Sequence, residues 1–207
     1  MFSALAKLMK PARPAGAPAR LVILISSRGS NMRAILDKIR SKELNAVCTL
    51  VLSDREAKGL AVAKTYGVQT ELFTKHKEES REAFDARLAD RLRKEKPELI
   101  VCAGYLRIIS EPMLKAFPGR IVNIHPSLLP AFPGLKAQKQ ALDYGVKVTG
   151  CTIHLVDRGV DTGQILEQRA VRVKATDTEA TLSQRILAAE HDAYWRTIAA
   201  YLASLRA

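Results

Sequence analysis

Apolar runs alternate with amphipathic stretches along most of the chain. Five runs are apolar on both faces, the pattern of strands covered on both sides in a parallel sheet. They are Leu21–Ser26, Ala46–Ser53, Val68–Phe73, Glu98–Gly104 and Arg120–His125. The stretches between them predict helices over Asn31–Arg40, Glu56–Tyr66 and Ser80–Lys96. The alternation predicts an α/β fold in which a mostly parallel central sheet is flanked by helices.

The pattern changes after the fifth run. Pro126–Leu135 holds three prolines and a glycine, which predicts an ordered loop. Val148–Val156 and Ile165–Val173 predict two more strands, the second with less regular alternation, and Thr178–Tyr201 predicts a closing helix. No internal repeat or interdomain linker is visible in the sequence, so we expect one domain over residues 21–207.

Residues 1–20 differ in composition from the rest. They carry four cations and no acid, with prolines at positions 11, 14 and 18. Because proline cannot continue a helix, we expect a flexible basic tail rich in proline and alanine. Its weakly amphipathic start leaves an organelle transit peptide as an alternative. A secretory signal is disfavoured because no long apolar region follows.

Composition and charge narrow the class of protein. Of 207 residues, 47% are hydrophobic and 26% charged, which is ordinary globular composition. No apolar run approaches the roughly 20 residues of a membrane-spanning helix, so an integral membrane protein is excluded. The net charge of +12 suits nucleic acid, anionic lipid headgroups or small anionic substrates. Charge alone does not choose among these.

The three cysteines, Cys48, Cys102 and Cys151, each lie within an apolar strand-like run. An odd number without a CxxC spacing argues against a disulfide framework and against a thiolate metal site. We therefore expect buried free thiols and a reducing, cytoplasmic compartment.

The turn Ser26–Asn31 leaves the first strand and enters a helix. Its backbone N–H groups and the helix dipole would form an anion site, with the Ser30 hydroxyl as a further donor. Gly29 would let the backbone approach a phosphate closely. The alternative is a plain turn with Ser30 as the N-cap. The turn has neither the GxGxxG pattern nor a Walker lysine, so a nucleotide site is not predicted.

Asn123 and His125 end the fifth strand two positions apart, so their side chains share one face. An amide and an imidazole there can stabilise an oxyanion and move a proton, although a buried, hydrogen-bonded histidine is the alternative. Asp161, in a glycine-flanked loop, would favour the protonated imidazole if the loop reached His125, and is otherwise a turn residue. We expect His154 to be a supporting hydrogen-bonding residue. No ligand spacing supports a metal site.

Four motifs stand in order along the chain: GSN at Gly29–Asn31, AGYLRIIS at Ala103–Ser110, NIHPSLLPAFPGL at Asn123–Leu135 and VDTGQIL at Val160–Leu166. Together they resemble the phosphoribosylglycinamide formyltransferases, a family of folate-dependent enzymes. The resemblance implies a single Rossmann-like domain of the formyltransferase type. It also implies formyl transfer from 10-formyltetrahydrofolate, a cosubstrate, to the amine of 5′-phosphoribosylglycinamide in purine (IMP) biosynthesis, with no metal.

The resemblance assigns roles position by position. Asn123, His125 and Asp161 match the catalytic residues of the family: His125 as proton donor, Asn123 on the formyl oxygen, and Asp161 keeping His125 protonatable. The residues that match the substrate site, on the phosphate and the ribose, are Gly29, Ser30, Asn31 and Glu190. The residues that match the folate site are Arg81, Leu106, Arg107, Ile108, Ile109 and Asn123.

The chain also departs from the family pattern. Many relatives have glycine where this chain has Ser27, which reduces the freedom of the phosphate turn. Some bacterial relatives have histidines where this chain has Lys136 and Gln138. None of these changes affects the three catalytic positions, and their effect on affinity is not predicted.

Three other functions are weighed against this one. A methionyl-tRNA formyltransferase is expected to carry a C-terminal RNA-binding domain, for which 207 residues leave no room. A formyltetrahydrofolate hydrolase is expected to carry an N-terminal regulatory domain and needs no phosphate turn. A nucleic-acid-binding module needs clustered aromatic residues, which make up only 5% here. We expect small-molecule substrates, neither nucleic acid nor membrane as a partner, and a monomer or homodimer.

Overall fold

The computed structural model describes residues 16–207. Residues 1–15, most of the predicted flexible tail, lie outside the described residues. The first strand, β1 (Ala19–Ile25), begins at Ala19 and not at Leu21, so the end of the predicted tail is part of the sheet.

Strands and helices alternate as the hydrophobic pattern predicts. After β1 the strands are β2 (Ala46–Ser53), β3 (Thr70–Leu72), β4 (Leu99–Cys102), β5 (Ile121–His125), β6 (Val148–Leu155) and β7 (Ile165–Arg172). The helices are α1 (Ser30–Arg40), α2 (Lys58–Thr65), α3 (Arg81–Arg93), α4 (Glu111–Ala116), α5 (Ala137–Tyr144) and α6 (Glu179–Arg206).

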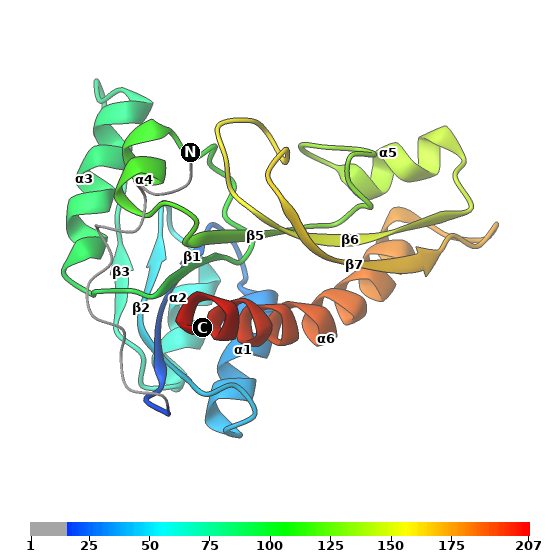
Figure 1. Ribbon diagram of the computed structural model, residues 1–207. Coiled ribbons are helices and arrows are strands. Elements are labelled where there is room, and N and C mark those ends of the chain that lie inside the picture. The colour runs from blue at the N-terminus through cyan, green and yellow to red at the C-terminus, as the bar shows by residue number, and fades with distance from the viewer. Residues whose placement is uncertain (1–15) are drawn as a thin grey trace, which may run out of the picture.

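The strands form one seven-stranded sheet in the order β3-β2-β1-β4-β5-β6-β7. The pairs from β3 to β5 are parallel, whereas β6 and β7 are antiparallel to their neighbours. Helices cover both faces of the sheet (Figure 1). The predicted α/β fold with a mostly parallel sheet is confirmed. Because β1 pairs with both β2 and β4, the chain reverses direction across the sheet there, the usual place for a ligand site at the carboxyl ends of strands.

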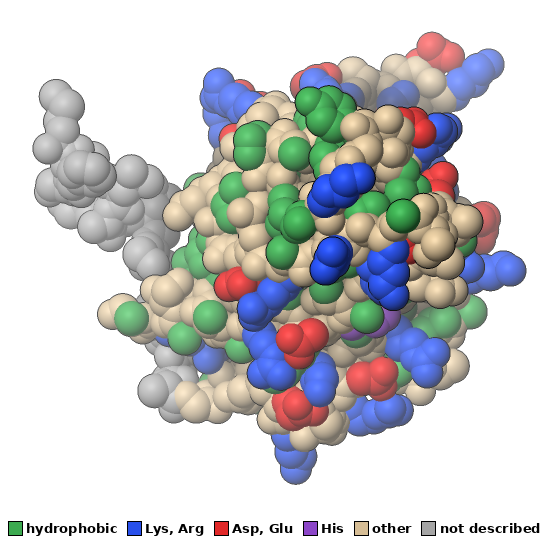
Figure 2. All heavy atoms as spheres, turned by 90° about the vertical axis from the view of Figure 1, so that its right-hand side faces the viewer, with side chains coloured by type: hydrophobic (Ala, Val, Ile, Leu, Met, Phe, Trp, Pro, Cys, Tyr) green, Lys and Arg blue, Asp and Glu red, His purple; other side chains and the backbone are tan. Residues whose placement is uncertain are grey.

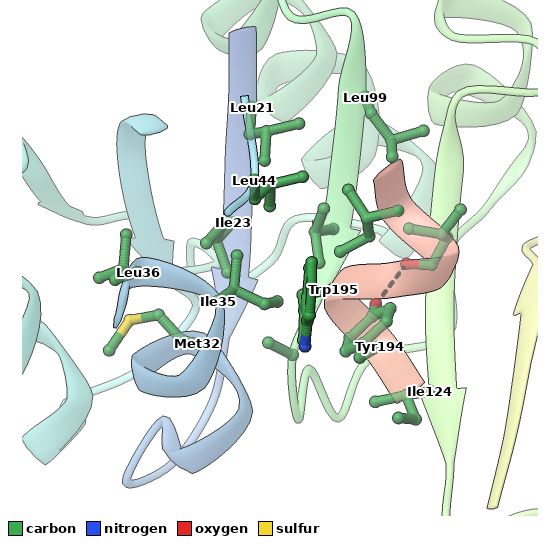
Figure 3. Close-up of a cluster of buried hydrophobic side chains, with 14 of the residues drawn as sticks. Leu21, Ile23, Met32, Ile35, Leu36, Leu44, Leu99, Ile124, Tyr194 and Trp195 are labelled. Atoms are coloured by element: carbon green, nitrogen blue, oxygen red, sulfur yellow. Dashed lines mark hydrogen bonds between the residues drawn. The ribbon is translucent and has the colours of Figure 1, made fainter. Parts of the chain in front are cut away.

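The core has two parts, one on each face of the sheet. In β1, Ile23 belongs to the cluster under α1 and α6, and Leu24 to the cluster under α3 and α4. This explains why the central strands are apolar at every position. On the α6 side, Tyr194 and Trp195 pack against the sheet (Figure 3). The Tyr194 hydroxyl lies 2.8 Å from the carbonyl oxygen of Cys102 and 3.2 Å from that of Val122, and so ties the helix to β4 and β5.

Two helices were not predicted from the sequence, α4 and α5. Helix α4 spans six residues, too few for a periodic pattern, and α5 buries only Ala137 and Ala141 on its inner face. Alanine at this spacing gives a weak apolar signal. The closing helix begins as predicted, with the Thr178 side chain accepting from the Thr181 N–H in a capping box.

Within residues 16–207, no helix is long and apolar enough to span a membrane.

Candidate active site

A cavity of about 560 Å³ lies at the carboxyl ends of the central strands. Its lining comes from the start of α1, the segment after β4, the end of β5, the loops after β5 and β6, and the middle of α6. The predicted site residues that line it are Ser30, Asn31, Leu106, Arg107, Ile108, Ile109, Asn123, His125, Asp161 and Glu190. A second hollow of about 460 Å³, lined by Arg33, Arg40 and Tyr66 among others, contains none of them.

His125 is 5% exposed and sits between two acceptors. Its Nδ1 lies 3.2 Å from Oδ2 of Asp161, and its Nε2 lies 2.8 Å from the carbonyl oxygen of Phe132. Neither oxygen is a donor, so the protonated imidazole, with an N–H on each side, satisfies both contacts. Asp161 thus reaches His125, which is the condition on which its expected role depends.

Asp161 reaches this position because the loop after β6 folds back over the sheet edge. A Cβ at Gly163 would lie only 1.8 Å from the carbonyl oxygen of Leu155, so the return of the chain requires glycine. Asp161 itself has a φ of 57°, in the left-handed region that aspartate tolerates better than most residues. Across the loops, its Oδ2 accepts the Gly134 N–H at 2.8 Å.

Asp161 is held in its ionised form. Burial alone would raise the pKa of this carboxyl. Hydrogen bonds from His154 and from the Gly134 N–H, together with the charge of His125, outweigh burial and lower the pKa below its ordinary value. An ionised carboxylate beside His125 is the arrangement that favours an imidazolium.

Asn123 and His154 face each other across the antiparallel pair of β5 and β6. The Asn123 Nδ2 lies 3.2 Å from the His154 Nε2, which is 3.6 Å from Oδ1 of Asp161. The His154 Nδ1 lies 2.8 Å from the carbonyl oxygen of Leu155, which fixes the ring. His154 thus has the supporting hydrogen-bonding position expected for it.

The two histidines and Asp161 are clustered but do not surround a common point. Within the described part of the chain, no group of three or more His, Cys, Asp or Glu side chains is arranged to hold a metal ion.

The turn before α1 places backbone donors at the cavity. Gly29, not Ser30, is the N-cap, with a φ of 72° and no side chain to cap the helix; the alternative of Ser30 as N-cap is wrong. A Cβ at Gly29 would lie 3.3 Å from the Gly59 Cα and 2.9 Å from the movable Met32 Cε, so this crowding adds to the preference for glycine that the positive φ already sets. Ser30 is exposed at the first helical position, where its N–H has no partner within the helix.

Glu190 and Asn31 form a buried pair beside this turn. The Asn31 Nδ2 donates to Oε2 of Glu190 at 2.8 Å, and the Asn31 Oδ1 is buried without a hydrogen-bond partner. Burial raises the pKa of Glu190 to about 7, against the opposing effect of the Asn31 hydrogen bond. An unpaired buried oxygen and a poorly solvated carboxyl at a cavity wall are both groups that a polar ligand can satisfy.

The segment after β4 supplies the apolar wall. Leu106 and Ile108 expose 54% and 46% of their surface, whereas Ile109 is buried in the core. The Arg107 guanidinium lies 4.1 Å from the centre of the Phe84 ring. Arg81 does not line the cavity: it is exposed at the start of α3 and pairs with Glu82.

Several contacts of the site have no signal in the sequence. The Phe132 carbonyl and the Gly134 N–H are backbone groups, which every residue carries. Lys136 and Gln138, noted as departures from a family pattern, do line the cavity, and Lys136 precedes α5 with a φ of 58°. Ser27 is exposed in the turn before α1.

This chain is similar in sequence and in fold to known proteins. A family model described as formyl transferase matches residues 19–198. The glycinamide ribonucleotide transformylase 1 structure from Symbiobacterium toebii has a TM-score of 0.88 and 48% identity, covering 90% of this chain and 89% of that one. The chain therefore belongs to the formyl transferase family.

Two further proteins are similar to this chain in sequence. The phosphoribosylglycinamide formyltransferase of Bacillus subtilis is 40% identical over 176 residues, which cover 84% of this chain and 90% of that protein. The trifunctional purine biosynthetic protein adenosine-3 of Drosophila melanogaster is 45% identical over 184 residues, 87% of this chain. This chain spans only 14% of that relative.

Proposed function

We propose that this protein transfers the formyl group of 10-formyltetrahydrofolate to the amine of 5′-phosphoribosylglycinamide, a step of purine biosynthesis. The observation that carries the proposal is the meeting of Asn123, His125 and Asp161 at the wall of one cavity, in a chain of the formyl transferase family. The names of the similar proteins support the choice of substrates.

In this proposal the two substrates share the cavity and contact different parts of its lining. The phosphate of the ribonucleotide binds at Gly29, Ser30 and Asn31, where backbone N–H groups and a helix N-terminus favour an anion. Glu190 accepts hydrogen bonds from the ribose hydroxyls. The folate lies along Leu106, Arg107, Ile108 and Ile109, which offer an apolar wall, and Asn123 contacts its formyl group.

Arg81 has a more distant role in this proposal. The folate carries a glutamate tail, which is anionic and extends away from the reacting formyl group. Arg81 lies outside the cavity lining, so it meets the tail and not the ring system. Lys and Arg side chains are spread over the face of the molecule seen in Figure 2, and the net charge is +12, which favours two anionic substrates.

In the reaction, the amine nitrogen attacks the formyl carbon and the carbonyl oxygen becomes an oxyanion. Asn123 and protonated His125 donate to that oxygen, and each such donor contributes on the order of 100- to 1,000-fold in rate. The bond from the formyl carbon to the folate nitrogen then breaks. The proton lost by the attacking amine passes to that nitrogen through His125 or through a water held by Asp161.

The Phe132 carbonyl has a part in this scheme. In the structure it accepts from His125 Nε2, the nitrogen that does not face Asp161. The formyl oxygen competes for this N–H, so Phe132 keeps the ring oriented until the donor binds. No residue at the site is required to hold a metal for these steps.

The proposal is tested by incubating the protein with both substrates and measuring the masses of the products by mass spectrometry. One formyl group added to the ribonucleotide is the expected result. Release of formate without a formylated acceptor would instead identify a hydrolase and contradict the proposal. Omitting each substrate in turn is the control.

We further infer that the enzyme works in the cytoplasm as a monomer or homodimer on small molecules, without nucleic acid or membrane as partner. Three buried, free cysteines suit a reducing compartment. Light scattering of the purified protein and fractionation of cells that express it test these points. A tetramer, or protein recovered with the membrane fraction, would contradict them.

A further inference from the structure

One wall of the cavity is a segment without regular secondary structure. Gly104–Ser110 leaves the sheet after β4 and continues as coil to α4. Two of its apolar side chains, Leu106 and Ile108, are about half exposed. Tyr105 and Ile109 anchor the segment in the core, but no strand or helix pairing fixes the backbone between and beyond them, so other hydrogen bonds must do so. The structure provides them at two points.

The first point is Ser26, at the end of β1. Its N–H donates to the carbonyl of Gly104 at 3.0 Å, and its Oγ accepts the Leu106 N–H at 2.9 Å. The same hydroxyl donates to Oδ1 of Asp54 at 2.6 Å, and both side chains are buried. A serine hydroxyl has one proton, so its donation to Asp54 leaves a lone pair directed at Leu106. Asp54 thus sets the direction of the hydroxyl.

The second point is Asp85, on α3. It is 1% exposed, and its Oδ2 accepts both the N–H and the hydroxyl of Ser110, each at 2.6 Å. The preceding residue of the helix, Phe84, carries the Arg107 guanidinium on its ring. One turn of α3 therefore holds the middle and the far end of the segment.

We propose that Asp54 and Asp85 are positioning residues for the formyl donor. Neither lines the cavity, but through Ser26 and Ser110 they fix the backbone that presents Leu106 and Ile108 to the folate. The inference rests on the proposed function, which places the donor against this wall. Short hydrogen bonds to carboxyl oxygens suit the task because they define direction as well as distance.

Kinetics separate positioning from a general structural role. In Asp85→Ala and Asp54→Ala, we expect the KM for 10-formyltetrahydrofolate to rise about tenfold, because a misplaced wall loses contacts to the donor. We expect the KM for the ribonucleotide and the kcat to change by less than about threefold. Asp85→Asn should recover part of the loss, since its Oδ1 still accepts from Ser110.

A matched control is Thr197→Ala, which removes a buried hydroxyl that donates to Ala193 within α6 and does not touch the segment. It should leave both KM values unchanged. An equal rise of both KM values in the aspartate variants, or a donor-selective rise in the control, would overturn the proposal.

A second measurement does not depend on catalysis. Hydrogen exchange of backbone amides can be followed by NMR. Asp85→Ala should speed exchange of the Ser110 amide and leave the Leu106 amide protected. Asp54→Ala should speed exchange of the Leu106 amide and leave the Ser110 amide protected. If an alanine variant fails to fold, Ser26→Ala replaces Asp54→Ala, and Asp85→Asn replaces Asp85→Ala with a smaller effect of the same sign. Unchanged exchange rates of these amides in the variants would refute the positioning role. A wild-type protein that is inactive, but whose Leu106 and Ser110 amides are protected, would refute only the proposed function.

Discussion

The Nδ1 of His125 lies 3.2 Å from Oδ2 of Asp161, although Asp161 belongs to the loop that follows the next strand. The contact places an ionised carboxylate against a buried imidazole whose other nitrogen also faces an oxygen. Both ring nitrogens of His125 are thus held by oxygens before any substrate binds. The first prediction follows from this pair.

Asp161→Asn keeps the size of the side chain and removes its charge. The imidazole of His125 then loses the facing negative charge that stabilises it when it carries the proton during transfer. The kcat should drop by about tenfold or more, since Asp161 also orders the reacting groups. The KM for folate and the unfolding midpoint should change little, because Asn still accepts from Gly134. Steady-state kinetics and denaturant unfolding check this; normal turnover in the variant contradicts it.

Ser30→Ala tests the phosphate turn. Losing one hydroxyl donor to an anion costs about 1.5 kcal/mol, so the KM for the ribonucleotide should rise about tenfold while that for folate stays the same. Ser27→Ala, in the same turn, is the matched control and should have no effect on either. Equal changes in both KM values would count against a phosphate site at this helix.

Part of this site could be predicted from the sequence and part could not. Asn123 and His125 are two positions apart on a strand, so their common face follows from the pleat. The approach of Asp161 depends on how a loop folds, which the glycines around it permit but do not dictate. His154 was recognised as a supporting residue, yet its pairing with Asn123 depends on the register of β6, which no local pattern sets.

The fold, too, could be predicted only in part from the sequence. The parallel sheet followed from strands that are apolar at every position, such as β1, because such strands need cover on both faces. Arg81 shows the opposite case: the family resemblance implies a role for it but no location, and the structure places it outside the cavity lining. Helix α5 was missed because its buried positions are alanines.

Glu190 gives a pH-dependent prediction. Its pKa is about 7 in the folded protein and 4.5 in the reference state, so the folded protein binds this proton more tightly. The free energy of unfolding therefore decreases as pH rises between these values, by about 3 kcal/mol for this residue alone. Glu190→Gln should match wild type near pH 4 and exceed it at pH 8. Urea unfolding at both pH values checks this; a difference independent of pH contradicts it.

The same titration should affect binding. Above about pH 7 the ionised carboxylate accepts hydrogen bonds from ribose hydroxyls, and below it the neutral acid accepts them more weakly. The KM for the ribonucleotide should therefore rise as pH falls from 8 to 6 in the wild type, and stay level in Glu190→Gln. A parallel rise in both proteins would assign the effect to another group, such as the substrate phosphate.

Tyr194→Phe tests the link between α6 and the sheet. The buried hydroxyl contacts two carbonyl oxygens, so its loss should lower the free energy of unfolding by about 1–2 kcal/mol. Tyr201→Phe is the control, because that hydroxyl bonds the carbonyl of Gly119 in an exposed position. Denaturant unfolding of both variants measures the two changes in the free energy of unfolding. Equal decreases would show that the buried Tyr194 hydroxyl stabilises the protein no more than the exposed one of Tyr201.

The most direct test of the account follows a labelled formyl group through one turnover. With the protein in excess over 10-formyltetrahydrofolate carrying ¹³C in the formyl carbon, the label should appear as an amide on the ribonucleotide in wild type. His125→Ala should still bind the donor but transfer the label at least about 100-fold more slowly, since one oxyanion donor and the proton carrier are lost. Label released as formate, or transfer by His125→Ala at the wild-type rate, would contradict the assignment of this site.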